Sequence, residues 1–101
     1  MQRNVENFIG CESSYADAKI VLFGAPFAST TSFRPGARFG PAAMRHESFG
    51  LETYSPYQDK DLEDLAVFDS GDLELCFGSS EMALVDLEAR AREIVSDGKF
   101  P

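Results

Sequence analysis

Three arginines in the middle of the sequence could bind an anion. Arg34, Arg38 and Arg45 lie around a predicted helix start, where backbone amides and guanidinium groups can hold a phosphate or a carboxylate. The alternative is a structural role, in which these arginines pair with acidic residues of this or a neighbouring subunit, and we favour it.

Four hydroxyl side chains stand just before these arginines, at Ser29, Thr30, Thr31 and Ser32. A hydroxyl becomes a useful nucleophile when a base lies beside it, and the sequence pairs none of the four with a base. Nucleophilic catalysis therefore has no support, and the stretch also lacks the GK[ST] ending of a phosphate-binding loop.

Three further residues could ligate a metal or act as a base. Asp69 and Asp72 lie close together near Glu74, and carboxylates are ligands for hard metal ions. Aspartates also form turns through bonds from the side chain to the nearby backbone, and we favour that role here. His46 has only Glu47 beside it and no partner at helical spacing, so we expect a surface histidine.

The composition indicates a folded globular protein with an acidic surface. Of 101 residues, 44% are hydrophobic and 12% aromatic, and 17 acidic against 9 basic residues give a formal net charge of -8. This charge argues against nucleic acid or an anionic membrane surface as a partner, since both attract basic patches. Cys11 and Cys76 form no metal-binding pattern, and no apolar run approaches the roughly 20 residues of a membrane span. We expect a cytoplasmic protein without a disulfide framework.

A buried strand and a helix start must position the central residues. Residues 20–23 are apolar without alternation, which is typical of a strand covered on both faces in a parallel sheet. Pro41 marks the helix start, because a proline in the first turn gives up a donor that has no partner there, and Gly50 suits a left-handed helix end. The loop between them leaves the carboxyl end of a strand, which is where open α/β sheets build their sites.

The second half of the chain predicts another strand and a long helix. Residues 51–64 indicate a surface loop with one short ordered turn, and residues 65–69 a strand that ends in a turn at residues 70–72. A serine after Gly78 caps the helix, Glu81 lies at its positive end and Gly98 ends it. Its apolar stripe consists of Leu84, Leu87, Ala91, Ile94 and Val95, with Glu88, Arg90, Arg92 and Glu93 facing water.

The last residues stand where an α/β pattern begins its next strand. Two strands and two helices cannot form a covered parallel sheet, since each buried strand needs neighbours on both edges. We therefore expect this chain to be the opening third of a larger fold, either truncated or completed by other chains. Studied alone, it should associate through its unpaired strand edges.

Two motifs carry a family resemblance, GAPF at residues 24–27 and TTSFRPGARFGPAAMR at residues 30–45. They resemble the N-terminal signature of the ureohydrolase (arginase/agmatinase) family, and the agmatinase branch is the nearer match. The similarity continues through GLETYSPY, FDSGD and DGKFP, which begin at positions 50, 68 and 97. We assign residues 1–18 to an N-terminal arm and residues 19–101 to the N-terminal portion of a single ureohydrolase α/β domain, incomplete at its C-terminus.

The resemblance implies a three-layer arginase-like α/β fold with a mainly parallel sheet, assembled as a homo-oligomer, either a trimer or a hexamer. It also implies hydrolysis of a small guanidino substrate at a centre of two Mn2+ ions, with agmatine giving urea and putrescine in polyamine biosynthesis. The family takes its metal ligands from later Gly-Gly-Glu-His, Asp-Ala-His-x-Asp and Ser-x-Asp-x-Asp motifs, which this sequence lacks. We expect the 101-residue chain by itself to be inactive.

The resemblance implies that the stretch before the helix is a substrate-pocket or interface loop. Its residues are Ser29, Thr30, Thr31, Ser32, Arg34 and Arg38. Arginines would repel a guanidinium group, so they should fix the loop or a subunit contact instead. Ala28 departs from the family, which usually has aspartate there, and the missing carboxylate should loosen the loop by about 1 kcal/mol or more. Two alternatives stay open: another guanidino-compound hydrolase (an arginase or a guanidinobutyrase), or a non-catalytic fragment or interaction module.

Overall fold

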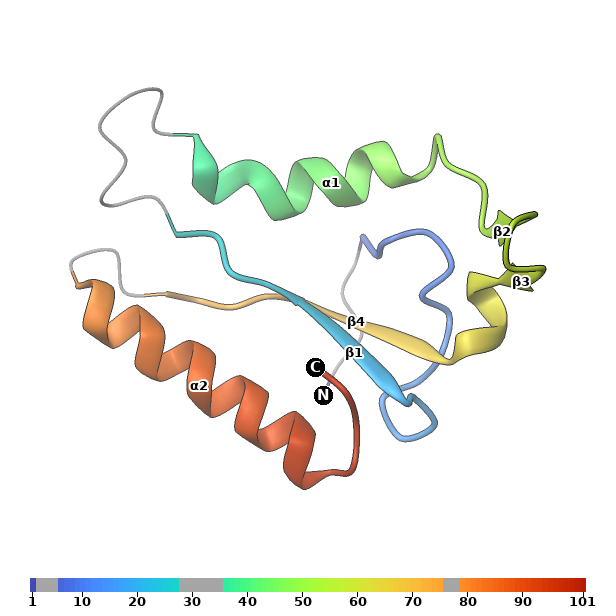
Figure 1. Ribbon diagram of the computed structural model, residues 1–101. Coiled ribbons are helices and arrows are strands. Elements are labelled where there is room, and N and C mark those ends of the chain that lie inside the picture. Colours follow the sequence, from blue (N-terminus) through green and yellow to red (C-terminus); the bar gives the residue numbers. More distant parts are fainter. Residues whose placement is uncertain (2–5, 28–35, 76–78) are drawn as a thin grey trace.

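The computed structural model places a small β-sheet between two α-helices (Figure 1). It describes Met1 and residues 6–27, 36–75 and 79–101. Helix α1 (Gly40–Ser48) lies on one side of the sheet and helix α2 (Ser80–Ser96) on the other, which is a three-layer α/β arrangement. Within these ranges, no helix is long and apolar enough to cross a bilayer.

The central sheet consists of two parallel strands, β1 (Ile20–Gly24) and β4 (Val67–Asp72), so the predicted parallel pairing is confirmed. Ile20 pairs with Val67 on one side and forms a parallel bridge with Phe100 on the other. The segment predicted to begin a further strand therefore lies alongside β1, and β1 is central in the sheet.

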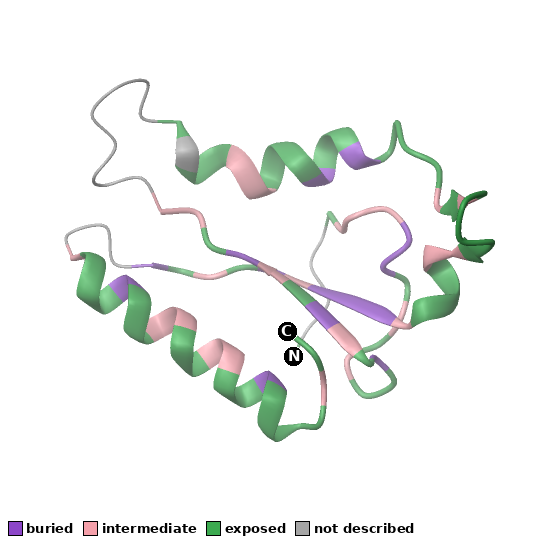
Figure 2. Ribbon diagram, viewed as in Figure 1, coloured by how far each residue is buried: buried purple, intermediate pink, exposed green. Residues whose placement is uncertain are grey.

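The hydrophobic core lies between the sheet and α2. Its buried members are Ala18, Val21, Phe68 and Ile94, with Tyr15 and Phe23 packed against them. The Tyr15 ring meets Phe68 edge to face, with the two ring centroids 5.6 Å apart. Figure 2 shows the buried residues along both strands and at separate points on both helices.

The opposite face of β1 is only partly covered. Leu22 remains 37% exposed, so the prediction that the strand is covered on both faces is wrong at this position. Successive side chains of a strand point to opposite faces. Leu22 consequently points away from the core that buries Val21, toward the side of α1.

Helix α1 begins as predicted and ends differently. Pro41 lies in its first turn. The prediction of a left-handed Gly50 is wrong, because the helix ends at Ser48 with Phe49 as a right-handed C-cap, and Gly50 is not among the glycines with positive φ. The Gly50 amide donates to the carbonyl of Glu47 at 3.1 Å, so an ordinary turn closes the helix.

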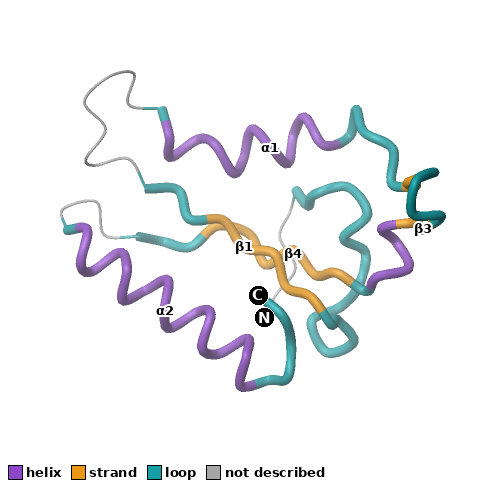
Figure 3. The backbone as a smooth tube through the Cα atoms, viewed as in Figure 1, coloured by secondary structure: helices purple, strands orange, loops and turns teal. Residues whose placement is uncertain are grey.

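The prediction of a loop over residues 51–64 needs correction. A short antiparallel hairpin, β2 (Tyr54–Ser55) and β3 (Lys60–Asp61), is followed by the 3-10 turn η2 (Leu62–Leu65) (Figure 3). The Asp61 side chain caps η2 by accepting a backbone amide at 3.0 Å. Local polar contacts hold these elements, so the sequence shows no hydrophobic periodicity that would predict them. A further 3-10 turn, η1 (Ala37–Phe39), leads into α1.

Strand β4 begins and ends later than predicted. The sequence predicts a strand at residues 65–69 and a turn at residues 70–72, whereas the strand runs from Val67 to Asp72. Ala66, with φ 52°, ends η2 and delays the start. Gly71, with φ 81°, stays inside the strand where its register with β1 shifts, because glycine adopts this conformation without strain.

Helix α2 has the predicted caps. The Ser79 hydroxyl accepts the Met82 amide at 3.2 Å, and Gly98 follows the last turn with φ 77°. The amides of Gly98 and Lys99 bond back to carbonyls of the last turn, which is the pattern of a Schellman motif. Both ends of α2 are thus set by local sequence.

The buried stripe of α2 differs from the prediction. Ile94 is buried as predicted, but Ala83, outside the predicted stripe, is buried too, and Leu84 and Val95 are 63% and 60% exposed. Arg90, predicted to face water, is partly buried and donates to a serine hydroxyl of β4 at 3.3 Å. Two strands offer the helix a narrow surface, so they cannot cover the whole predicted stripe.

Candidate functional site

A buried ion-pair network joins α1 to the end of β4. Nε of Arg45 lies 2.7 Å from Oδ2 of Asp69, and Nη2 lies 3.0 Å from Oδ1. Nη1 of Arg45 donates to Oδ1 of Asp72 at 2.5 Å. Arg45 is 4% exposed and Asp69 is fully buried. We call these three residues the Arg45 network, and its two-bond geometry orients α1 over the strand.

The N-terminal arm is tied to this network. Both carboxylate oxygens of Asp69 accept one more bond each, from the Phe8 amide at 2.8 Å and the Gly71 amide at 3.0 Å. Beside them, the Ser48 hydroxyl accepts the Ile9 amide at 3.0 Å and donates to a carbonyl of α1 at 2.6 Å. The arm, the helix and the strand therefore meet at one buried carboxylate with no unpaired oxygen.

Gly24, the last residue of β1, touches the network. A Cβ at this position would lie 2.0 Å from Oδ1 of Asp72 and 2.7 Å from Cβ of Pro41. The Gly24 carbonyl accepts the Leu73 amide at 3.0 Å, which holds the two strand ends together. Because glycine has no side chain, β1, β4 and the start of α1 can converge here.

Burial and charge oppose each other in the network. Burial by itself raises the pKa of Asp69, but the bonds from Arg45 and from the Gly71 and Phe8 amides outweigh it, and this pKa lies below its ordinary value. Burial likewise lowers the pKa of Arg45, and the bonds to Asp69 and Asp72 outweigh it, so that the pKa rises. The Arg45–Asp69 pair therefore stays ionised near neutral pH.

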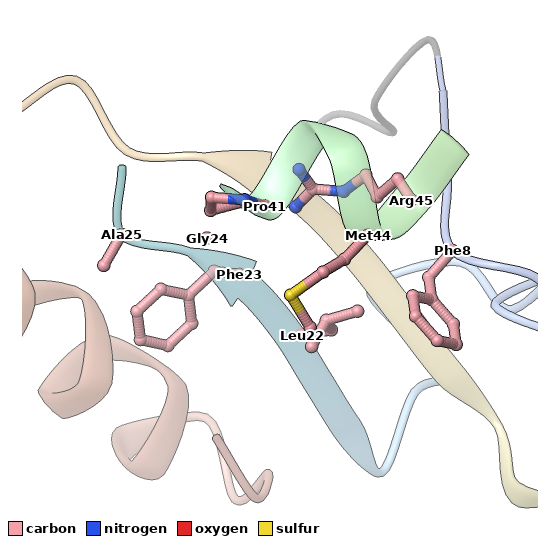
Figure 4. A pocket seen from close by; sticks show the side chains of 8 residues that line it. All are labelled: Phe8, Leu22, Phe23, Gly24, Ala25, Pro41, Met44 and Arg45. Carbon is pink, nitrogen blue, oxygen red and sulfur yellow. The ribbon is translucent and has the colours of Figure 1, made fainter. Parts of the chain in front are cut away.

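An apolar pocket of about 190 Å3 opens beside the network, between β1 and α1 (Figure 4). Its lining includes Phe8, Leu22, Phe23, Pro41, Met44 and Arg45. Figure 4 shows Leu22 and Met44 side by side, while Phe23 points the other way, toward α2. Since the guanidinium of Arg45 is already bound to carboxylates, the pocket favours an apolar occupant.

The structural role favoured for the arginines is confirmed at Arg45, which pairs with acidic residues of its own chain. Arg38 is exposed, with its guanidinium 4.7 Å from the centroid of the Phe39 ring, and the network does not include it. The remaining candidates lie outside the described residues, namely Ser29, Thr30, Thr31, Ser32 and Arg34, together with Ala28.

The side-chain to backbone bonding favoured for Asp69 and Asp72 is confirmed at Asp69, whose carboxylate accepts the Gly71 amide. The pairing of both carboxylates with Arg45 was not predicted. Sequence reasoning missed this pairing because a contact between a helix and a distant strand leaves no local pattern. The one available signal was two acidic residues at a predicted strand end, in a chain with an arginine on the preceding helix.

The structure also places the single histidine. The His46 side chain is 79% exposed and its Nδ1 lies 3.6 Å from a carboxylate oxygen of Glu6, so the predicted surface position is confirmed. Over residues 6–27, 36–75 and 79–101, no three His, Cys, Asp or Glu side chains gather in a way that could hold a metal ion.

The layers and the parallel strands place this chain in the three-layer α/β class. The model of the arginase family matches residues 18–101. The chain belongs to the arginase family, in agreement with its motifs.

Several relatives of this chain are named agmatinases. Those of Bacillus subtilis (strain 168) and Halalkalibacterium halodurans are 46% and 47% identical to this chain over 94 residues. Each match covers 93% of this chain and 32% of the relative. The chain thus spans about a third of the length of the curated relatives it matches.

A solved structure has the same fold in this region. The agmatine ureohydrolase of Thermoplasma volcanium is 31% identical, with a TM-score of 0.88, and the match covers 97% of this chain and 33% of that chain. The predicted arginase-like α/β fold is therefore confirmed for this portion.

Proposed function

We propose that this chain is the first portion of an agmatinase-like ureohydrolase, which hydrolyses the guanidinium group of agmatine to urea and putrescine. The proposal is supported by similarity to agmatinases both in sequence and in backbone fold. The chain is 46% identical to the agmatinase of Bacillus subtilis, and it superposes with a TM-score of 0.88 on the agmatine ureohydrolase of Thermoplasma volcanium.

The charge of the Arg45 network is compatible with a cationic substrate. An arginine without a partner near the strand ends would repel a guanidinium group. Here, one arginine is paired with the carboxylates of Asp69 and Asp72, so that the network carries a net negative charge. It lies at the carboxyl edge of the strands, where open α/β sheets build their sites. Its proposed task is to hold β1, β4 and α1 in place.

The proposal includes two manganese ions, the metal set that the family resemblance implies. Such a centre needs several histidine or carboxylate donors close together. The described residues do not fit this requirement, because Arg45 occupies the Asp69 and Asp72 carboxylates and no other cluster of ligands forms there. We therefore propose that the metal ligands lie outside the described residues.

Assembly and location are also proposals. The family resemblance supports a homo-oligomer, either a trimer or a hexamer. We propose the cytoplasm as its location, where the product putrescine would enter polyamine biosynthesis. Light scattering on the intact protein would give the subunit number.

A chimera tests whether this chain can serve in an agmatinase. The chain replaces the matching segment of the Bacillus subtilis agmatinase, and urea release from agmatine is measured with manganese and after chelation. We expect manganese-dependent hydrolysis, with the unmodified relative as the control. A chimera that folds and binds manganese but releases no urea would contradict the proposal.

The substrate needs a separate assay on protein purified from the cells that produce it. Urea release is compared for agmatine, arginine and 4-guanidinobutyrate at equal concentrations. We expect agmatine to have the highest kcat/KM. Faster hydrolysis of either competitor would move the assignment to an arginase or a guanidinobutyrase.

A further inference from the structure

Asp69 and Asp72 lie three positions apart on β4, and both bind the guanidinium of the same arginine. Side chains three positions apart on a regular strand point to opposite faces of the sheet. In this sheet Asp69 pairs with Leu22. Asp72 pairs with Gly24, so β4 takes three steps where β1 takes two. The extra residue forms a bulge, in which Gly71 has a φ of 81°, and the bulge brings the Asp72 carboxylate to the side of α1.

The two carboxylates differ in how completely Arg45 neutralises them. Asp69 is fully buried and accepts two parallel bonds from the guanidinium, which is the geometry of a closed ion pair. Asp72 accepts the remaining bond, at 2.5 Å from Nη1 to Oδ1, and its side chain is 29% exposed. One guanidinium faces two carboxylates, so one negative charge is left over. Because Asp69 is shielded from water, this excess charge is exposed at Asp72.

The excess charge lies at the edge of the sheet where open α/β proteins build their sites. Asp72 is the last residue of β4, and it lines an open pocket of about 460 Å3 between the strand end and α2. Gly24, the last residue of β1, leaves room for the carboxylate, since a Cβ there would lie 2.0 Å from Oδ1. A fixed negative charge at such an edge attracts cations and repels anions.

We infer that Asp72 is a specificity-determining residue, whose carboxylate favours guanidino substrates of higher positive charge. The inference rests on the proposed function and deepens it. Agmatine carries a guanidinium and an ammonium group, arginine has a carboxylate in addition, and 4-guanidinobutyrate has a carboxylate in place of the ammonium group. Their net charges near neutral pH are therefore +2, +1 and 0. Attraction by a fixed negative charge decreases in the same order.

A purely structural role for Asp72 leads to a different expectation. If Asp72 only held the strand ends in place, its replacement would slow the hydrolysis of every substrate by a similar factor. Asp72→Asn separates the two roles, because the asparagine oxygen can still accept the bond from Arg45 while the negative charge is lost. Asp72→Glu keeps the charge and should keep the preference among substrates.

The test uses the chimera of this chain with the Bacillus subtilis agmatinase, unchanged and with Asp72→Asn. In Asp72→Asn at low ionic strength we expect kcat/KM to fall about two- to fourfold for agmatine, by less for arginine, and not at all for 4-guanidinobutyrate. Added salt should shrink the loss, because it screens exposed charges. Asp64→Asn is the matched control, since it removes an exposed charge from η2, before the amino end of β4, and should leave the preference unchanged.

Two results would overturn the inference. One is an equal loss for all three substrates, which would assign a structural role to Asp72. The other is an unchanged ratio of agmatine to 4-guanidinobutyrate in Asp72→Asn at low ionic strength. Dissociation constants from calorimetry give the same ratio for a chimera that binds these compounds without turnover. If the unchanged chimera prefers arginine, the proposed function fails, while the dependence on substrate charge still decides this inference.

Discussion

Arg45 holds Asp69 through two parallel hydrogen bonds, from Nε to Oδ2 at 2.7 Å and from Nη2 to Oδ1 at 3.0 Å. Both side chains are withdrawn from water, so each charge depends on the other for its solvation. The same carboxylate accepts amides from Phe8 and Gly71. The arm, the first helix and the second long strand are thus held at a single ion pair.

Replacing Arg45 should destabilise the fold strongly. Arg45→Met leaves the Asp69 carboxylate buried without its cation, which costs about 3–5 kcal/mol in the free energy of unfolding. Urea denaturation followed by circular dichroism measures the change. Arg92→Met is the control, because Arg92 forms an exposed pair with Glu88 on α2, and a loss there of similar size would contradict the assignment. Adding Asp69→Leu to Arg45→Met should recover part of the stability.

Acid should weaken the protein through Asp69. Its pKa is lower in the folded state than in the unfolded state, so its contribution is complete above the unfolded value of 3.8 and is lost as the pH falls through the folded value. We expect the free energy of unfolding to decrease as the pH is lowered from about 5 to below 3. Denaturation curves at several pH values measure this slope. The slope should shrink in Asp69→Asn and persist in Asp64→Asn, an exposed control, and an unchanged slope in Asp69→Asn would argue against the pairing.

A methyl group at Gly24 should disturb the network. In Gly24→Ala the new Cβ would lie 2.0 Å from Oδ1 of Asp72, so a strand end or the carboxylate must move, at a cost of about 1–3 kcal/mol. Thermal unfolding measures the loss. Gly40→Ala, at the first position of α1 with open space around its Cβ, is the matched control and should be neutral or slightly stabilising. Equal effects at the two glycines would contradict the close contact.

The N-cap of α2 should contribute measurably to stability. Ser79→Ala removes the hydroxyl that accepts the Met82 amide, which costs about 1 kcal/mol. The free energy of unfolding from chemical denaturation reports this loss. Ser96→Ala, at the exposed last residue of the same helix, should change it by less than about 0.5 kcal/mol. A Ser79 variant as stable as the Ser96 variant would show that the cap is dispensable.

Local sequence signals predicted the features that depend on neighbouring residues alone. The apolar run before Gly24 identified β1, Pro41 the start of α1, and Ser79 and Gly98 the two ends of α2. Each of these acts through the conformation or hydrogen bonds of a few adjacent residues. The long motif at residues 30–45 likewise indicated the arginase family through the identity and order of its residues.

Tertiary structure decided which side chains meet. Ion pairs and burial depend on residues far apart in the sequence, so helical spacing, which did predict a buried Ile94, could not show that α2 buries Ala83 and leaves Leu84 exposed. Nor could a local turn preference reveal that Asp69 and Asp72 form ion pairs with Arg45, which lies 24 and 27 positions away in the sequence. A residue's neighbours in sequence set its backbone conformation. Ion pairs between distant residues form only when the helix packs on the sheet and the arm packs against both.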